Sequence, residues 1–298
     1  MNKEIFNAII NTSDGEIDLL IASPPCQGMS MAGKSRNPSK MIKDERNYLI
    51  YKVVDTIILK SPKYVLIENV PLLLKLKLPL KSEIYNILDI FTKLFKDQYN
   101  IEADIINAAD YGVPQIRKRS IVRLYKKGLS WELPSFVKNH LFVEDAIGDL
   151  PSLEAGENSN INWHFARNHT KEHVICMKNT PTGLSAFENK KYYPKKKNGK
   201  KIKGYNTTYR RMEWRKPAPT ITIRNDAISS QRNVHPGRLL ADGTYSDARV
   251  LTPLELMRLS SIPDNWKISK DTNETLIRQC IGECIPPLMV NNILSGIV

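Results

Sequence analysis

A Pro-Pro-Cys-Gln-Gly run, residues 24–28, places the thiol of Cys26 directly after a short apolar stretch, residues 17–22. That stretch has the length of a buried parallel strand, and the two prolines end its hydrogen-bond ladder. A thiol at the carboxyl end of a parallel strand lies where open α/β sheets bind their ligands. Because a thiolate is a strong nucleophile near neutral pH, Cys26 is a candidate nucleophile. The alternative is a small buried cysteine without chemistry.

Two further groups could serve the same chemistry. A Glu-Asn-Val run starts at Glu68, after the apolar residues 64–67, so this carboxyl should also emerge at the end of a strand. A Gln-x-Arg-x-Arg run contains Arg117 and Arg119, whose spacing along a strand puts both on one face. Together with the thiol, these groups form a coherent set for attack on an electron-poor ring. The thiolate would add to the ring, the acid would protonate a ring nitrogen, and the arginines would hold a ring oxygen and a phosphate. The alternatives are a capping role for the glutamate and solvated positions for the arginines.

The Arg-x-Leu-Thr-x-x-Glu run at residues 249–255 has a different character. Thr252 and Glu255 have the spacing of a helix N-cap and its capping-box partner, so we predict a structural role for them.

With these motifs the chain resembles the DNA cytosine methyltransferases that make 5-methylcytosine. The resemblance covers most of the chain outside a variable middle section. It rests on five motifs in the order of that family: P-P-C-Q-G-x-S at 24–30, D-x-R-N-x-L at 44–49, E-N-V at 68–70, Q-x-R-x-R at 115–119 and R-x-L-T-x-x-E at 249–255.

The resemblance implies covalent catalysis on a cytosine that is flipped out of the duplex. Cys26 would add to carbon 6, which makes carbon 5 nucleophilic toward the methyl group of S-adenosylmethionine. Glu68 would bind the exocyclic amine and protonate the adjacent ring nitrogen, a role that needs a protonated carboxyl and that burial beside a base would favour. Arg119 would contact the flipped cytosine, and Arg117 would contact phosphate or steady its loop.

The resemblance also implies binding residues. Gln27 and Ser30 fall in the loop that closes over DNA, and Arg46 falls at the far end of that loop. Cofactor contacts are expected at three positions, Pro24, Leu49 and Gly282. Glu283 stands where the family usually has an asparagine.

One family feature has no counterpart in these 298 residues. The family's first strand ends in a Phe-x-Gly-x-Gly-Gly motif that wraps the methionine part of the cofactor, and no Gly-x-Gly occurs anywhere in the sequence. We therefore expect a sheet without its first strands, in a large subunit of a split methyltransferase whose companion chain supplies the glycine-rich site. The alternatives are a catalytically inactive DNA-binding remnant and an unrelated enzyme that pairs Cys26 with a histidine. The latter fits poorly, because all five histidines lie at or beyond His140.

Composition agrees with a polyanionic partner, double-stranded DNA. The formal net charge is +13, and 41% of the residues are hydrophobic, enough for one sizeable core and a smaller module. Four cysteines without a paired pattern, and no signal or membrane-spanning stretch, predict a cytoplasmic protein without membrane contact.

The positive charge is concentrated in residues 190–203, where tyrosines lie among lysines. Phosphate contacts are predicted for Lys196, Lys200 and, shortly after, Arg211; a flexible solvated loop is the alternative for the lysines. Thr220 lies in a segment, 216–221, that resembles the family's base-reading Thr-Leu element. The spacing of His169, His173 and Cys176 could suit a metal, but no fourth ligand is nearby in the sequence, and we predict no metal site.

The predicted fold class is α/β, a truncated, doubly wound, Rossmann-like methyltransferase sheet with a smaller target recognition domain. The catalytic domain is expected to span 1–150 and 248–298, and the recognition domain 151–247. The expected strands are 17–22, 64–67, 101–106 and 119–125. The expected helices are 3–10, 47–60, 82–97, 252–260, 273–280 and 286–297, with a short bridging helix within 143–150.

Overall fold

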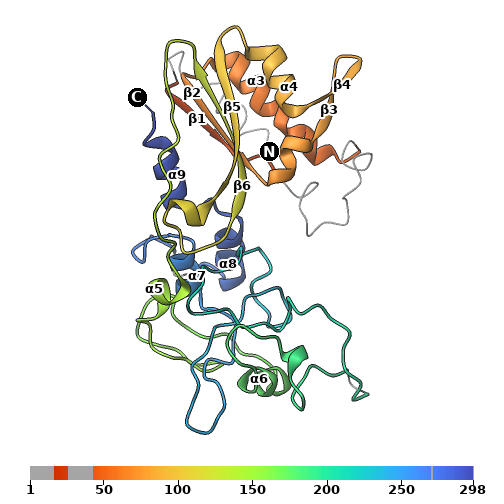
Figure 1. Ribbon diagram of the computed structural model, residues 1–298, viewed down its shortest axis with the longest axis vertical. Helices are drawn as coiled ribbons and strands as arrows, with labels where there is room; N and C mark the ends of the chain where they lie inside the picture. Colours follow the sequence, from red (N-terminus) through yellow and green to blue (C-terminus); the bar gives the residue numbers. More distant parts are fainter. Residues whose placement is uncertain (1–16, 26–42, 197, 270, 298) are drawn as a thin grey trace. The chain divides into compact units, whose positions relative to one another are not determined.

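The computed structural model describes residues 17–25, 43–196, 198–269 and 271–297 (Figure 1). The chain divides into two compact units. Unit 1 comprises residues 1–107, 118–133 and 295–298, and unit 2 comprises residues 108–117 and 134–294. Each unit is described by itself.

Unit 1 contains a four-stranded sheet with the order β1-β2-β6-β5. Its strands are β1 (Leu19–Ala22), β2 (Tyr64–Asn69), β5 (Tyr99–Asn107) and β6 (Lys118–Lys126). β1 and β2 run parallel, and β6 is antiparallel to both of its neighbours. The carboxyl ends of β1 and β2 therefore meet at the edge where β6 begins.

One face of this sheet packs on helices α3 (Ile50–Lys60) and α4 (Ile87–Phe95) (Figure 1). Alternate residues of the two central strands, Val65, Ile67, Val122 and Leu124, are fully buried in this core. Side chains alternate between the faces of a strand, so this spacing directs them all to the helical layer. The apolar burial fixes the register of the central strands.

The opposite face of the sheet is covered by an aromatic side chain from the segment after β6. Trp131 is buried and meets the ring of Tyr64 edge to face, with 5.7 Å between the ring centroids. Arg123, also on this face, donates to the Trp131 carbonyl and forms an ion pair with Asp104 at 3.1 Å. β2 is thereby buried along its whole length.

Shorter elements complete unit 1. The 3-10 helix η1 (Glu45–Leu49) leads into α3, and a second one, η2 (Pro71–Lys75), follows β2. β3 (Lys77–Leu80) and β4 (Glu83–Asn86) form a separate two-stranded hairpin. Asn86 then caps α4 by accepting from the Asp89 amide at 3.0 Å.

Unit 2 is built mostly of loops and short helices. In chain order these are η3 (Ala108–Tyr111), α5 (Val143–Ile147), α6 (Lys171–Lys178), η4 (Ala186–Glu188), α7 (Pro253–Leu259), α8 (Glu274–Glu283) and α9 (Pro287–Leu294). One core joins α5, α7 and α8 with residues 212–221, and another joins α6 with residues 228–250. Among the described residues, no helix is both long and apolar enough to span a membrane.

The predicted α/β class is confirmed, as are the four strands of the sheet and the helices after residue 47, with shifted ends. The helix predicted at 82–97 was wrong at its start, because residues 83–86 form β4 and Asn86 caps the helix. The helix predicted at 3–10 lies outside the described residues. The compact units also differ from the predicted domain boundaries: residues 248–294 join unit 2, because the apolar side of α7 is buried there.

Candidate functional site

Glu68 lies at the carboxyl end of β2 and is only 5% exposed. Its two carboxylate oxygens have different partners. Arg119, at the start of β6, brings its Nε to 2.8 Å from Oε1, and the Ser23 hydroxyl donates to Oε2 at 2.7 Å. The antiparallel pairing of β6 with β2 brings the arginine to the carboxylate. The strand-end carboxyl and Arg119, which were predicted separately, thus form an ion pair in unit 1.

The segment before Cys26 is bound to the end of β2 by a second side chain. The Asn69 amide donates to the Pro24 carbonyl at 2.8 Å and accepts from the Val70 amide at 2.9 Å. The Ser120 hydroxyl donates to the Val70 carbonyl at 3.0 Å. Pro24 is therefore tied to the end of β2.

Three predicted site residues, Cys26, Gln27 and Ser30, lie outside the described residues. Ser23, in contrast, was missed by the sequence analysis. The signal that could have found it is strand register, since Ala22 pairs with Ile67 and the next residues along the two parallel strands are Ser23 and Glu68.

Arg117 was predicted to act with Arg119, but the structure gives it another role. It is only 4% exposed and donates to the carbonyls of Ile221, at 2.9 Å, and Gly282, at 3.4 Å, all within unit 2. The alternation argument failed because β6 begins at Lys118, so Arg117 precedes the strand. Arg117 therefore steadies its loop, one of the two roles predicted for it, and the prediction that it shares a strand face with Arg119 was wrong.

Gln115 connects its own loop to the segment that carries Thr220. Its side-chain oxygen accepts from the Ile221 amide, and its nitrogen donates to the Leu259 carbonyl, both at 3.2 Å. The Thr220 hydroxyl donates to the Ile116 carbonyl at 2.7 Å while the residue stays exposed. Thr220 is thus held in a defined place and remains accessible.

The three predicted cofactor contacts fall in both units, Pro24 and Leu49 in unit 1 and Gly282 in unit 2. A Cβ atom on Gly282 would lie 2.5 Å from the carbonyl carbon and oxygen of Thr222, so this glycine allows α8 to approach the chain closely. The Pro24 carbonyl accepts from Asn69, and Leu49 is half-buried at the end of η1. Gly282 therefore has a packing role, and the three cofactor contacts remain predictions.

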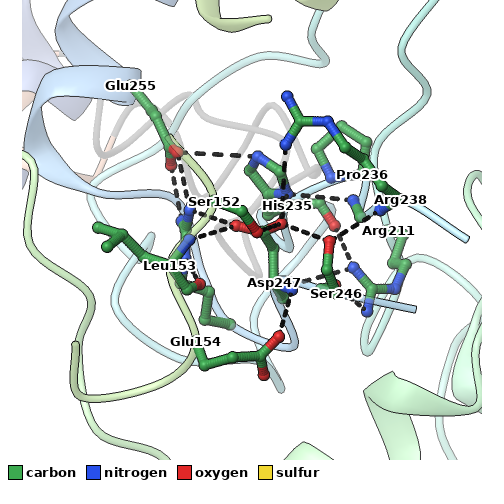
Figure 2. A network of polar contacts seen from close by, with 12 residues as sticks. Ser152, Leu153, Glu154, Arg211, His235, Pro236, Arg238, Ser246, Asp247 and Glu255 are labelled. Carbon is green, nitrogen blue, oxygen red and sulfur yellow. Dashed lines mark hydrogen bonds and ion pairs between the residues drawn. The ribbon is translucent and has the colours of Figure 1, made fainter. Parts of the chain in front are cut away.

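Arg211 was predicted to contact phosphate, yet it is only 1% exposed (Figure 2). Its guanidinium donates to the carbonyls of Met177, His235, Ser246 and Asp247. Burial lowers its pKa to about 10, which still leaves it charged at neutral pH. This prediction was wrong, because sequence alone does not distinguish a buried arginine from a surface one.

A buried ionic network surrounds Arg249 in unit 2. The guanidinium binds both oxygens of Glu255, at 2.8 and 2.9 Å, and one oxygen of Asp247 at 2.8 Å. Thr252 caps α7 by accepting from the Glu255 amide at 3.2 Å, and the glutamate accepts from the Thr252 amide at 2.7 Å. The predicted capping box is confirmed, and the motif has a structural role.

His235 lies between the two acids of this network, 3.7 Å from Asp247 and 3.7 Å from Glu255 (Figure 2). Burial lowers its pKa to about 3, so the ring is neutral. Burial alone would raise the pKa of Glu255, but the adjacent Arg249 guanidinium and hydrogen bonds from Arg249 and Thr252 bring it to about 2. The network therefore consists of two carboxylates, one guanidinium and a neutral imidazole.

The lysine-rich segment folds back on itself. Lys195 and Lys201 form a backbone bridge, and the left-handed Gly199, with φ of 78°, belongs to the turn between them. The ammonium groups of these two lysines lie 4.9 and 4.8 Å from the centre of the Tyr193 ring. Lys196 and Lys200 are exposed in the same turn.

The remaining predicted residues have local partners. Arg46 is exposed and binds Asp44, with Nε 2.9 Å from Oδ1. His169 accepts from the Val250 amide at 3.2 Å, and His173 lies 3.2 Å from the Tyr209 hydroxyl. In the part of the chain that the structure describes, no group of three His, Cys, Asp or Glu side chains could hold a metal ion.

The fold is that of an α/β methyltransferase, as two solved structures show. A prophage-encoded protein of E. coli described as a DNA modification methyltransferase aligns with a TM-score of 0.66 at 21% identity, over 99% of this chain and 82% of that one. The Entamoeba histolytica methyltransferase EhMeth aligns with a TM-score of 0.56 at 18% identity, over 96% and 80%.

The sequence comparison defines the family. The model of the C-5 cytosine-specific DNA methylases matches residues 2–298, and the chain belongs to this family. It is 58% identical to the Type II methyltransferase M1.HgaI of Avibacterium volantium over 297 residues, which are 99% of this chain and 83% of the relative. It is 30% identical to M1.HphI of Haemophilus parahaemolyticus, over 98% of this chain and 71% of the relative.

Proposed function

We propose that this chain methylates carbon 5 of a cytosine flipped out of duplex DNA, as part of a Type II restriction-modification system. The observation that carries the proposal is the Glu68–Arg119 pair, 2.8 Å apart at the end of β2. This pair lies beside the segment that leads to Cys26. Membership of the cytosine C-5 methylase family and the 58% identity to M1.HgaI support the reaction and its setting. We also propose that it acts in the cytoplasm.

In the proposed reaction, the Cys26 thiolate forms a bond to carbon 6 of the cytosine. Glu68 binds the exocyclic amine and transfers a proton to the adjacent ring nitrogen, so the electron pair of the opened double bond reaches carbon 5. Arg119 can hold the ring oxygen while its Nε stays on Glu68. The low exposure of this pair, 12% for the arginine and 6% for the glutamate side chain, strengthens such contacts.

The methyl donor that the family implies is S-adenosylmethionine, which supplies the methyl group. Since no Gly-x-Gly occurs in the sequence, we propose that polypeptide outside this chain completes the pocket of this donor. A companion chain with the glycine-rich motif is our specific form of this proposal. Methylation by this chain alone would contradict the proposal of a companion chain, and the proposed reaction would still stand.

Exposed side chains of unit 2 support a DNA interface. We propose that Lys196 and Lys200 contact phosphates, because both are exposed in the lysine-rich turn. Thr220 is the proposed base-reading residue, since its hydroxyl is anchored while the residue is exposed. Gln27 and Ser30, with Arg46, remain proposed contacts of the loop that closes over DNA.

The test is the 5-methylcytosine content of DNA from cells that express this chain with its companion. The proposal predicts new 5-methylcytosine at one sequence, lost when Cys26→Ser is introduced. An inactive DNA-binding remnant would bind DNA equally well with either residue and leave no methylation. That second outcome would overturn the proposed function.

A further inference from the structure

The geometry points to Ser23 as a positioning residue of the active site, and this inference rests on the proposed function. We propose that the Ser23 hydroxyl orients the Glu68 carboxyl by binding one of its two oxygens. Its Oγ donates to Oε2 at 2.7 Å, while Arg119 occupies Oε1 at 2.8 Å. Each carboxylate oxygen therefore has its own donor.

Strand register makes this contact possible. β1 and β2 are parallel, with Ala22 opposite Ile67, so the chain positions that follow are Ser23 and Glu68. The Asn69 amide binds the Pro24 carbonyl at 2.8 Å and fixes the backbone just beyond the serine. The hydroxyl thus comes from a backbone that is tied to the same strand end as the carboxyl.

The terminal torsion of a glutamate is broad, so a single donor leaves the carboxyl plane poorly defined. Two donors on different oxygens define the plane, and with it the direction in which a proton could be passed to a ring nitrogen. Among the described residues, Arg119 is the charged group in contact with Glu68. Asp104 is separated from Glu68 by β6, because Ile121 pairs with both residues, and its carboxylate binds Arg123.

A hydroxyl suits this position because it can donate to an ionised carboxylate and accept from a protonated one. Removing the hydroxyl should leave the plane of the Glu68 carboxyl less well fixed. Threonine keeps the hydroxyl, whereas alanine removes it.

The first experiment observes the Glu68 carboxyl by carbon-13 NMR at constant pH in protein labelled at glutamate, with Glu68→Gln to assign the signal. We expect its chemical shift to change in Ser23→Ala and to stay near the parent value in Ser23→Thr. An unchanged chemical shift in Ser23→Ala would overturn the role of Ser23, whatever the protein's activity. Ser120→Ala is the matched control, because its hydroxyl binds the Val70 carbonyl and not Glu68.

The second experiment measures the single-turnover methylation rate and the KM for DNA of the full protein with its companion. Ser23→Ala should lower the rate about 10-fold with little change in the KM for DNA, and Ser23→Thr should restore the rate. A rate loss equal to that of Ser120→Ala would show a merely structural role and overturn the proposal. If the parent protein forms no 5-methylcytosine, the proposed function fails, and the NMR comparison still decides the contact.

Discussion

Two regions of this molecule combine arginines with carboxylates, and they do so in opposite ways. At the end of β2, Glu68 has one arginine and one hydroxyl as partners and keeps some exposure. In unit 2, Arg249 is fully buried and already binds two carboxylates. The first arrangement leaves hydrogen-bonding capacity for a substrate, and the second uses its capacity within the fold. Residue type alone therefore does not separate a chemical site from a structural one. The difference lies in how exposed the charged groups are and in whether all their hydrogen-bonding positions already have partners.

The largest effect is expected from Glu68→Gln. Removing the proton donor should lower methylation by about 10²- to 10⁴-fold, while the melting temperature stays close to that of the parent protein. Glu102→Gln is the matched control, since Glu102 is another strand carboxylate paired with an arginine, Arg123. Single-turnover rates for both variants measure the difference. Equal activity of the two variants would contradict the assignment of Glu68 to a chemical site.

Of the substitutions in unit 2, Arg249→Met should lower the free energy of unfolding the most. It leaves the carboxylates of Asp247 and Glu255 buried without their guanidinium, at a cost of about 3–5 kcal/mol. Arg258→Met provides the comparison, because Arg258 pairs with the largely exposed Asp149 and Asp264, where about 1 kcal/mol or less is expected. Urea denaturation measures both free energies of unfolding. Similar costs for the two variants would contradict the structural role of the buried network.

Gly282→Ala tests the close approach of α8 to Thr222. The added Cβ atom would overlap backbone atoms at 2.5 Å, so we expect a loss of about 1–3 kcal/mol in the free energy of unfolding. The neighbouring exposed residue gives the control Glu283→Ala, expected to change little. Unchanged stability together with a raised KM for S-adenosylmethionine would contradict the packing role and support the predicted cofactor contact of Gly282.

His235→Gln should flatten the dependence of stability on pH. The unfolded histidine takes up a proton near pH 6.5, whereas the buried one resists protonation down to about pH 3. The unfolded state then binds more protons between these values, so stability falls as pH falls, by up to about 1.4 kcal/mol per pH unit for one group. Denaturation midpoints between pH 7 and pH 4 measure the slope. A slope equal to that of the parent would show that this ring does not stay neutral.

The smallest effect is expected on the lysine-rich turn. The double change Lys196→Ala and Lys200→Ala should weaken DNA binding about equally for all sequences and reduce the salt slope of log affinity by about 1.8. Replacing both lysines by arginine keeps the charge and should preserve the slope. Titrations at several salt concentrations provide the test. An unchanged slope in the alanine variant would place the phosphate contacts elsewhere.

Much of the fold could be predicted from the sequence, because the apolar residues within 64–67 and 119–125 indicate strands that are buried in the structure. The start of α4 could not, since β4 is stabilised by its hairpin partner and not by its own pattern. The unit boundaries were equally out of reach. The burial of α7 depends on residues 212–221, which are remote in the chain.

The residues of the candidate site likewise divide into those that the sequence could predict and those that it could not. Glu68 and Arg119 could be predicted, because each stands at a strand end and the motif order is informative. The buried positions of Arg117 and Arg211 could not be predicted, since their carbonyl acceptors come from distant segments. Ser23 has no motif signal of its own, and only strand register identifies it.

The central claim is that the strand-end site performs covalent chemistry on a cytosine through Cys26. Duplex DNA with 5-fluorocytosine at the methylated position, S-adenosylmethionine and the full protein with its companion test it most directly. We predict a stable protein–DNA adduct that maps to Cys26 and disappears in Cys26→Ser. A protein that methylates ordinary DNA yet forms no adduct, or forms it equally with Cys26→Ser, would contradict the claim.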